Sequence, residues 1–171
     1  MPEPTVLDPA SGSRMFYFDK DDERVLFGDM RTMEPTVFSN GQTVEVRPDT
    51  LMDFRALPFE DDRFHLVIFD PPHLDNAGPE SWMRAKYGFL GSSWRDDLRA
   101  GFAECFRVLR PLGTLIFKWS EVRIPVADVL ALTPERPLIG HRSGRNMKTH
   151  WIAFMKAESP DSSQQDRGAG D

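Results

Sequence analysis

Residues 64–74 read FHLVIFDPPHL, an apolar run that stops at an acid, two prolines and a histidine. The run is nearly unbroken, which is typical of a central parallel strand covered on both faces. Because a proline cannot donate to a sheet ladder, the strand is expected to end near Asp70. Ligands of open parallel sheets bind just beyond the carboxyl ends of the strands. Asp70, Pro71, Pro72 and His73 therefore fall where chemistry is expected.

A second candidate is the stretch LDPASGS, a turn after the first short strand. Gly12 lets the backbone turn tightly and approach a ligand, and the start of the helix expected after it offers free N–H groups. Asp8 either accepts hydrogen bonds from a cationic amine or organises the turn. Ser13, Arg14 and Met15 follow Gly12, so the stretch is not the G-x-G-x-x-G of dinucleotide sites. This argues against a nicotinamide enzyme.

Two further acids follow predicted strands. Asp29 ends RVLFGD, where a carboxylate can accept hydrogen bonds from two ribose hydroxyls or can cap a loop. Asp53 lies at the end of TLMDF, where it can accept a hydrogen bond from an adenine amino group. Asp49 competes with Asp53 for that role. Each acid taken alone leaves both interpretations open.

The elements that position these residues alternate between strands and helices. Alternation of this kind indicates a Rossmann-like, doubly wound α/β sheet of seven strands, mostly parallel, with an antiparallel edge strand from the closing pair. Asn40-Gly41 predicts a hairpin between short strands, and Pro125 is a favoured first residue of a helix. The predicted strands are 5–8, 24–29, 50–54, 64–69, 114–119, 137–142 and 149–156, and the predicted helices are 13–18 and 93–110.

Composition sets limits on the class of protein. The chain of 171 residues, 40% hydrophobic, suits one well-buried domain, expected over 5–156, while the polar stretch 157–171 is expected to be disordered. The sequence has no long apolar run and no signal peptide, so no membrane association and a cytoplasmic location are expected. A net charge of −6 argues against broad non-specific binding to nucleic acid. The single cysteine, Cys105, is expected in the core.

Taken together, these motifs resemble a known family. Asp8-Pro9-x-x-Gly12, the acid that ends the second strand, D-x-R-x-LPF, DPPH and RVLRPLGTLIF resemble the class I S-adenosylmethionine-dependent methyltransferases. The tetrapeptide DPPH resembles the [DNS]-P-P-[YFW] signature of the amino-methyltransferases that modify adenine N6 or cytosine N4. The resemblance covers residues 5–156, and it is closer to small methyltransferases encoded by phages and prophages. A phage-encoded enzyme would act in the cytoplasm of its host.

The resemblance implies a role for each matching residue. Asp70 and the carbonyl group of Pro71 would accept hydrogen bonds from the target amine, and the rigid prolines would hold that geometry. Two fixed acceptors place the nitrogen lone pair in line with the methyl group, so neither a metal ion nor a covalent intermediate is required. S-adenosylmethionine is the implied cofactor, and the residues implied to bind it are Asp8, Pro9, Ala10, Gly12, Asp29, Asp53, Phe54 and Asp70.

His73 departs from the pattern, because the family usually has an aromatic ring there that stacks on an extruded base. An imidazole can stack more weakly, hydrogen-bond or take a proton, or it can serve the loop structurally. Other cations and aromatic residues are candidates for substrate contact or are merely solvated or packed. These residues are Tyr87, Lys118, Arg142, Arg145 and Lys148.

No segment clearly supplies a helix or ribbon for reading the major groove. A nucleic-acid substrate, with a nucleobase amino nitrogen in DNA as acceptor, is therefore expected together with low specificity or with a protein partner that confers it. The alternatives are methylation of RNA, protein or a small molecule. A non-catalytic subunit that binds S-adenosylmethionine for a partner enzyme is the remaining alternative.

Overall fold

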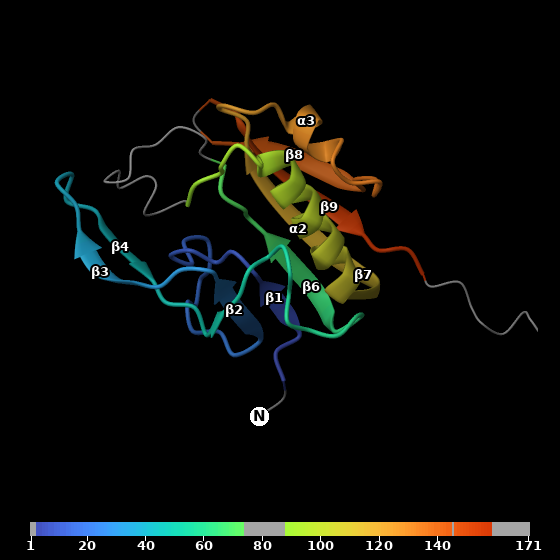
Figure 1. The fold of residues 1–171 in the computed structure, drawn as a ribbon, viewed down its shortest axis with the longest axis horizontal. Helices are drawn as coiled ribbons and strands as arrows, with labels where there is room; N and C mark the ends of the chain where they lie inside the picture. Colours follow the sequence, from blue (N-terminus) through green and yellow to red (C-terminus); the bar gives the residue numbers. More distant parts are fainter. Residues whose placement is uncertain (1–2, 74–87, 145, 159–171) are drawn as a thin grey trace, which may run out of the picture.

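The computed structural model describes residues 3–73, 88–144 and 146–158. Over these ranges the chain forms a seven-stranded sheet in the order β5-β2-β1-β6-β7-β9-β8 (Figure 1). Pairings from β5 to β7 are parallel, and β9 is antiparallel to both β7 and β8. The strands are β1 (Val6–Asp8), β2 (Val25–Asp29), β5 (Thr50–Leu51), β6 (Phe64–Phe69), β7 (Leu109–Ser120), β8 (Ile139–Ser143) and β9 (Thr149–Met155).

This topology confirms the predicted Rossmann-like, mostly parallel sheet with an antiparallel closing pair. The antiparallel strand β9 lies between β7 and β8, so the outer position belongs to β8. The carboxyl ends of β1, β2, β6 and β7 meet at one edge of the sheet because these strands are parallel. That edge is where the sequence places its candidate chemistry.

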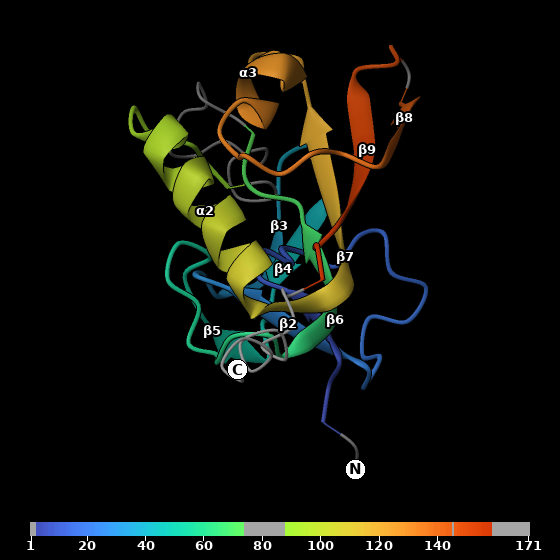
Figure 2. The same cartoon turned by 90° about the vertical axis from the view of Figure 1, so that its right-hand side faces the viewer.

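The core lies between the sheet and the helix α2 (Trp94–Val108), which runs along one face (Figures 1 and 2). Helix residues Leu98, Phe102 and Cys105 are buried against the strand residues Phe69 and Phe117. Burying a phenylalanine side chain contributes about 1.5–3 kcal/mol, so a few such rings hold the helix to the sheet. Burial also raises the pKa of the Cys105 thiol, as suits a packing residue.

The helix predicted over 13–18 does not form, and this prediction is wrong. Arg14 instead adopts a left-handed backbone conformation, with φ of 52°. Its buried guanidinium group donates to Asp49 Oδ1 at 2.7 Å and to the carbonyl oxygen of Arg47 at 2.6 Å, and it lies 3.9 Å above the ring of Phe27. These contacts pull the segment onto the sheet, and they outweigh the weak helix propensity of its aromatic residues.

Other predicted elements differ mainly in length. The hairpin at Asn40-Gly41 is confirmed as a separate two-stranded sheet, β3 (Met33–Val37) and β4 (Thr43–Val46). The strand predicted over 50–54 is shorter, because Asp53 and Ala56 form an isolated bridge instead. The predicted short helix forms as α3 (Val126–Leu130), with Pro125 as its N-cap residue, one position before the helix. Residues 157–171 lie mostly outside the described ranges.

Strand β7 begins earlier than predicted, because α2 passes directly into it. The turn expected at RPLG does not separate the helix from the strand. Instead, the pairing of β7 with β6 is irregular there. In the described part of the chain, no helix has both the length and the apolar character needed to cross a membrane.

Candidate functional site

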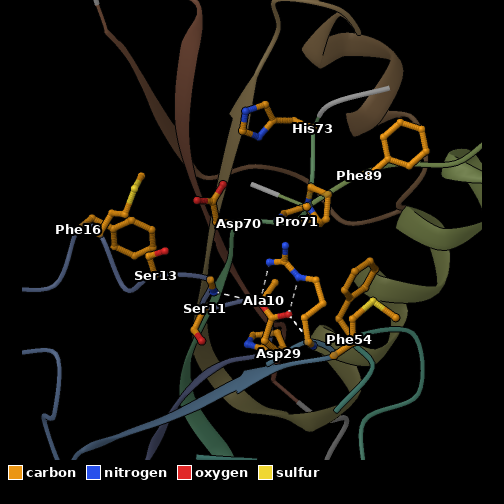
Figure 3. Close-up of a pocket in the computed structure, with 17 residues that line it drawn as sticks. Ala10, Ser11, Ser13, Phe16, Asp29, Phe54, Asp70, Pro71, His73 and Phe89 are labelled. Carbon is orange, nitrogen blue, oxygen red and sulfur yellow. Dashed lines mark hydrogen bonds and ion pairs between the residues drawn. The ribbon is translucent and has the colours of Figure 1, made fainter. Parts of the chain in front are cut away.

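A cavity of about 250 Å³ opens at the carboxyl edge of the sheet (Figure 3). The turn after β1, the end of β2 and the segment after β6 supply most of its wall. The side chains labelled in Figure 3 surround it, with His73 and Phe89 at one end and Asp29 and Phe54 at the other. Of the four acids predicted from sequence, Asp29 and Asp70 line this cavity and Asp8 and Asp53 do not.

The turn after β1 forms one wall, and it includes the predicted residues Pro9, Ala10 and Gly12. Gly12 has φ of +50°, a conformation in which glycine carries little strain. Its N–H group donates to Asp29 Oδ2 at 3.1 Å, which ties the turn to β2. The hydroxyl groups of Ser11 and Ser13 are buried at the cavity without a hydrogen-bond partner among the described residues. They are available to a ligand.

Asp29, one of the residues predicted to bind the cofactor, lines the cavity and is buried. Its carboxylate accepts hydrogen bonds from the N–H of Arg31 at 2.9 Å and from Arg31 Nε at 3.0 Å, in addition to the one from Gly12. Arg31 also lines the cavity. The positive charge of Arg31 thus lies beside Asp29, the acid that was expected to meet ribose hydroxyl groups. The sequence analysis missed this arginine.

Asp8 is not among the residues that line the cavity. The side chain is fully buried, and it accepts hydrogen bonds from the Tyr17 hydroxyl at 2.8 Å and from the N–H of Ala10 at 3.2 Å. Burial raises the pKa of Asp8 to about 7, against the effect of these two donors. Of the two interpretations left open by the sequence, this position matches the one in which Asp8 organises the turn.

Asp53 is not among the residues that line the cavity. The carboxylate is held by Arg55, with Nη2 to Oδ2 at 2.6 Å and the N–H of Arg55 to Oδ1 at 2.9 Å, and this pair lowers the pKa of Asp53. The position does not support the predicted contact with an adenine amino group. The strand ends before Asp53, and the following turn directs Phe54 to the cavity instead. The competing Asp49 is occupied by Arg14.

Asp70, Pro71, Pro72 and His73 all line the cavity. Asp70 Oδ2 accepts a hydrogen bond from Lys118 Nζ at 2.5 Å. The second oxygen, Oδ1, is buried and has no partner among the described residues. A carboxylate oxygen in that state is a strong acceptor that lacks a donor, so a ligand that brings an N–H or O–H group would satisfy it.

His73 is partly buried at the cavity, edge-on to Trp119 with 6.2 Å between ring centroids. Burial lowers the pKa of His73, while Asp70 opposes that shift and the backbone of Pro71 does so through a hydrogen bond. The imidazole is consequently neutral near pH 7. A neutral planar ring can stack, donate or accept, so the alternatives drawn from the sequence persist.

The structure describes three of the five residues predicted to contact a substrate. Lys118 reaches the cavity region through Asp70, whereas Arg142 and Lys148 are exposed residues near the far edge of the sheet and do not line the cavity. Tyr87 and Arg145 lie outside the described residues. Within those described, no cluster of histidine, cysteine, aspartate or glutamate side chains is arranged to hold a metal ion.

No protein-family model matches the sequence, and no curated protein matches it. Solved structures share its fold. The PH0226 protein from Pyrococcus horikoshii OT3 has a TM-score of 0.56 and 20% identity, covering 88% of this chain and 81% of its own. A TehB-like SAM-dependent methyltransferase from Corynebacterium glutamicum has a TM-score of 0.52 and 14% identity, covering 91% of this chain and 82% of its own.

A third structure contains ligands. The 1,6-didemethyltoxoflavin-N1-methyltransferase of Burkholderia thailandensis was solved with 1,6-didemethyltoxoflavin and S-adenosylhomocysteine, and it has a TM-score of 0.50 and 16% identity over 90% of this chain and 71% of its own. The chain therefore has the fold of class I SAM-dependent methyltransferases. This confirms, for the fold, the resemblance seen in the sequence.

Proposed function

We propose that this protein is an S-adenosylmethionine-dependent methyltransferase that transfers a methyl group to an amino nitrogen of a nucleobase in DNA, adenine N6 or cytosine N4. The observation that carries the proposal is the unpartnered Oδ1 of Asp70, buried among described residues at the wall of the cavity. It is followed by two prolines, at the strand end where sheets of this type bind their ligands.

The described residues suit the cofactor. The nucleoside would meet Asp29 and the ring of Phe54, and the amino-acid end would meet the turn 9–13, where two serine hydroxyl groups lack partners among the described side chains. In this proposal Asp8 supports that turn from below, and Asp53 has no contact with the cofactor. S-adenosylmethionine supplies an electrophilic methyl group when bound.

The residues of the chain then have to orient the acceptor. An amino group bound at Asp70 donates one hydrogen to Oδ1 and a second to the carbonyl oxygen of Pro71, which has a second lone pair besides the one that accepts from His73. The lone pair of the amino group is then directed away from both acceptors. The rigid Pro71-Pro72 backbone keeps that direction fixed. His73 stays neutral near pH 7, because burial lowers its pKa, so it offers a planar face and a polar edge to the base.

Methyl transfer from tritiated S-adenosylmethionine to separate DNA, RNA and protein pools tests the proposal. We expect label in DNA, and we expect Asp70→Ala to lose roughly 100-fold in rate while cofactor affinity stays the same, because the acceptor is no longer oriented. Asp61→Ala is the matched control, since Asp61 pairs with Arg107 on the surface at 2.8 Å. Label confined to another pool, or full activity in Asp70→Ala, would contradict the assignment.

A second candidate is N-methylation of a small molecule. The net charge of −6 favours it, because an acidic protein gains little from the phosphates of DNA. The structurally similar enzyme from Burkholderia thailandensis has 1,6-didemethyltoxoflavin, a small molecule, bound. In the DNA case, a protein partner would supply the sequence specificity.

A further inference from the structure

Asp70 and two aromatic rings surround the ammonium group of Lys118. It lies on β7 directly after Phe117, which pairs with Phe69, so it faces Asp70 across the two strands. Its ammonium group is 2.5 Å from Asp70 Oδ2, 5.5 Å from the ring centroid of Phe16 and 5.7 Å from that of Trp151. Both members of the ion pair have side chains only 15% exposed.

In this arrangement the two carboxylate oxygens of Asp70 have different surroundings. Oδ2 is occupied by the ammonium group, and Oδ1 faces no donor from any described residue. The negative charge of the carboxylate is therefore already compensated, yet one strong acceptor is left for a ligand. Two further ionisable groups lie near Asp70, and their environments favour their neutral forms, since burial lowers the pKa of His73 and raises that of Asp8 to about 7.

We infer that Lys118 is a positioning residue that also determines specificity: by fixing Oδ2 and compensating the charge of Asp70, it makes the site accept a neutral N–H nucleophile and reject an ammonium group. The inference rests on the proposed function and narrows its substrate class. Amino groups of nucleobases are uncharged near neutral pH and donate N–H bonds readily. Aliphatic amines carry a proton at that pH, with pKa values near 10, and so arrive as cations.

A bare aspartate would favour the cationic acceptor, because a buried carboxylate attracts an ammonium group strongly. With Lys118 in place, a second ammonium group at Oδ1 would lie within a few ångströms of the first. At the effective dielectric constant of partly buried sites, such repulsion amounts to a few kcal/mol, which corresponds to at least about tenfold discrimination. The fixed lysine thereby excludes lysine side chains and polyamines.

The test compares two small acceptors in three variants. Methylation of deoxyadenosine or deoxycytidine is measured against methylation of a lysine-containing tripeptide, as the ratio of their kcat/KM values. We expect Lys118→Met to shift this ratio toward the tripeptide by at least about tenfold, because the freed carboxylate of Asp70 binds the ammonium group and takes its proton, which leaves a neutral amine to accept the methyl group. The same variant should lower kcat on the nucleoside, whereas Lys118→Arg keeps the wild-type ratio. Lys156→Met is the control, since Lys156 pairs with Asp62 at 2.6 Å away from the cavity.

Binding of the same two acceptors, measured by calorimetry without turnover, separates this inference from the proposed function. If the wild type methylates neither acceptor but Lys118→Met alone gains affinity for the tripeptide, the inference stands and the proposed reaction fails. If DNA is methylated but Lys118→Met leaves both the kcat/KM ratio and the affinity ratio unchanged, the proposed function stands and the inference is overturned. An equal shift in Lys156→Met would also overturn it.

Discussion

Replacing Asp29 by asparagine is expected to weaken both the fold and cofactor binding. The carboxylate accepts hydrogen bonds from the N–H of Gly12 at 3.1 Å and from three N–H groups of Arg31 at 2.9–3.2 Å. Asparagine keeps one acceptor oxygen and turns an amide NH₂ toward donors. Hydrogen bonds to charged groups contribute about 1.5–3 kcal/mol each, and Arg31 is one-third exposed, so its share is smaller.

We therefore expect Asp29→Asn to lower the free energy of unfolding by about 2–3 kcal/mol, measured by urea denaturation with tryptophan fluorescence. The turn at Gly12 loses its tie to β2, so affinity for S-adenosylhomocysteine should fall about tenfold or more in calorimetry. Asp53→Asn is the matched control, because that acid also pairs with an arginine two residues on but lies outside the cavity. Unchanged affinity in Asp29→Asn, or an equal loss in Asp53→Asn, would refute the placement of the cofactor.

Two further predictions concern buried positions. The folded state binds a proton at Asp8 up to about pH 7, whereas the unfolded chain releases it near 3.8, so this group makes stability fall as pH rises between those values. As pH rises through that window, the free energy of unfolding of Asp8→Asn, measured by urea denaturation, should rise relative to that of the wild type by up to about 1.4 kcal/mol per pH unit. A difference in unfolding free energy that stays constant with pH would contradict a buried carboxyl group at Asp8. In Gly101→Ala, the new Cβ would lie 2.7 Å from Phe69 Cζ and 2.8 Å from Phe54 Cδ2. We expect a loss of about 1–3 kcal/mol and weaker cofactor binding through Phe54, whereas Gly91→Ala, whose Cβ meets nothing closer than 3.9 Å, should change neither.

Hydrophobic pattern and turn chemistry were sufficient to predict the sheet. The apolar run 64–69 became the central strand β6, and Asn40-Gly41 became the hairpin tip. The helix predicted over 13–18 failed because its conformation depends on where one buried guanidinium group finds acceptors. The acceptors of Arg14 include Asp49, 35 residues away along the chain. Periodicity in a short window contains no information about such a contact.

Dependence on distant contacts also explains why only some of the predicted acids line the cavity. Three D-x-R tripeptides, at Asp22, Asp29 and Asp53, form one local motif, in which the carboxylate accepts from the N–H and the side chain of the arginine two residues on. Their sequences and local hydrogen bonds are alike, so sequence could not distinguish them. Burial distinguishes two of them, since the side chain of Asp29 is 5% exposed and that of Asp53 is 33% exposed.

The ion pairs near the cavity also explain how its loops are held in place although few helices pack against the sheet. In the described ranges, α2 covers one face, and a hairpin connects β2 to β5. Charged contacts hold the loops there instead: Arg14 joins the turn after β1 to Asp49, and Arg31 is held on Asp29. Lys118 joins β7 to the segment after β6 through Asp70. At least one charge in each pair is no more than 15% exposed. Because such a charge is costly without its partner, the pairs fix the loops in one arrangement. Asp70 Oδ1 is the buried carboxylate oxygen that this network leaves without a described donor, and in the proposed function the amino group of the substrate is the donor that completes it.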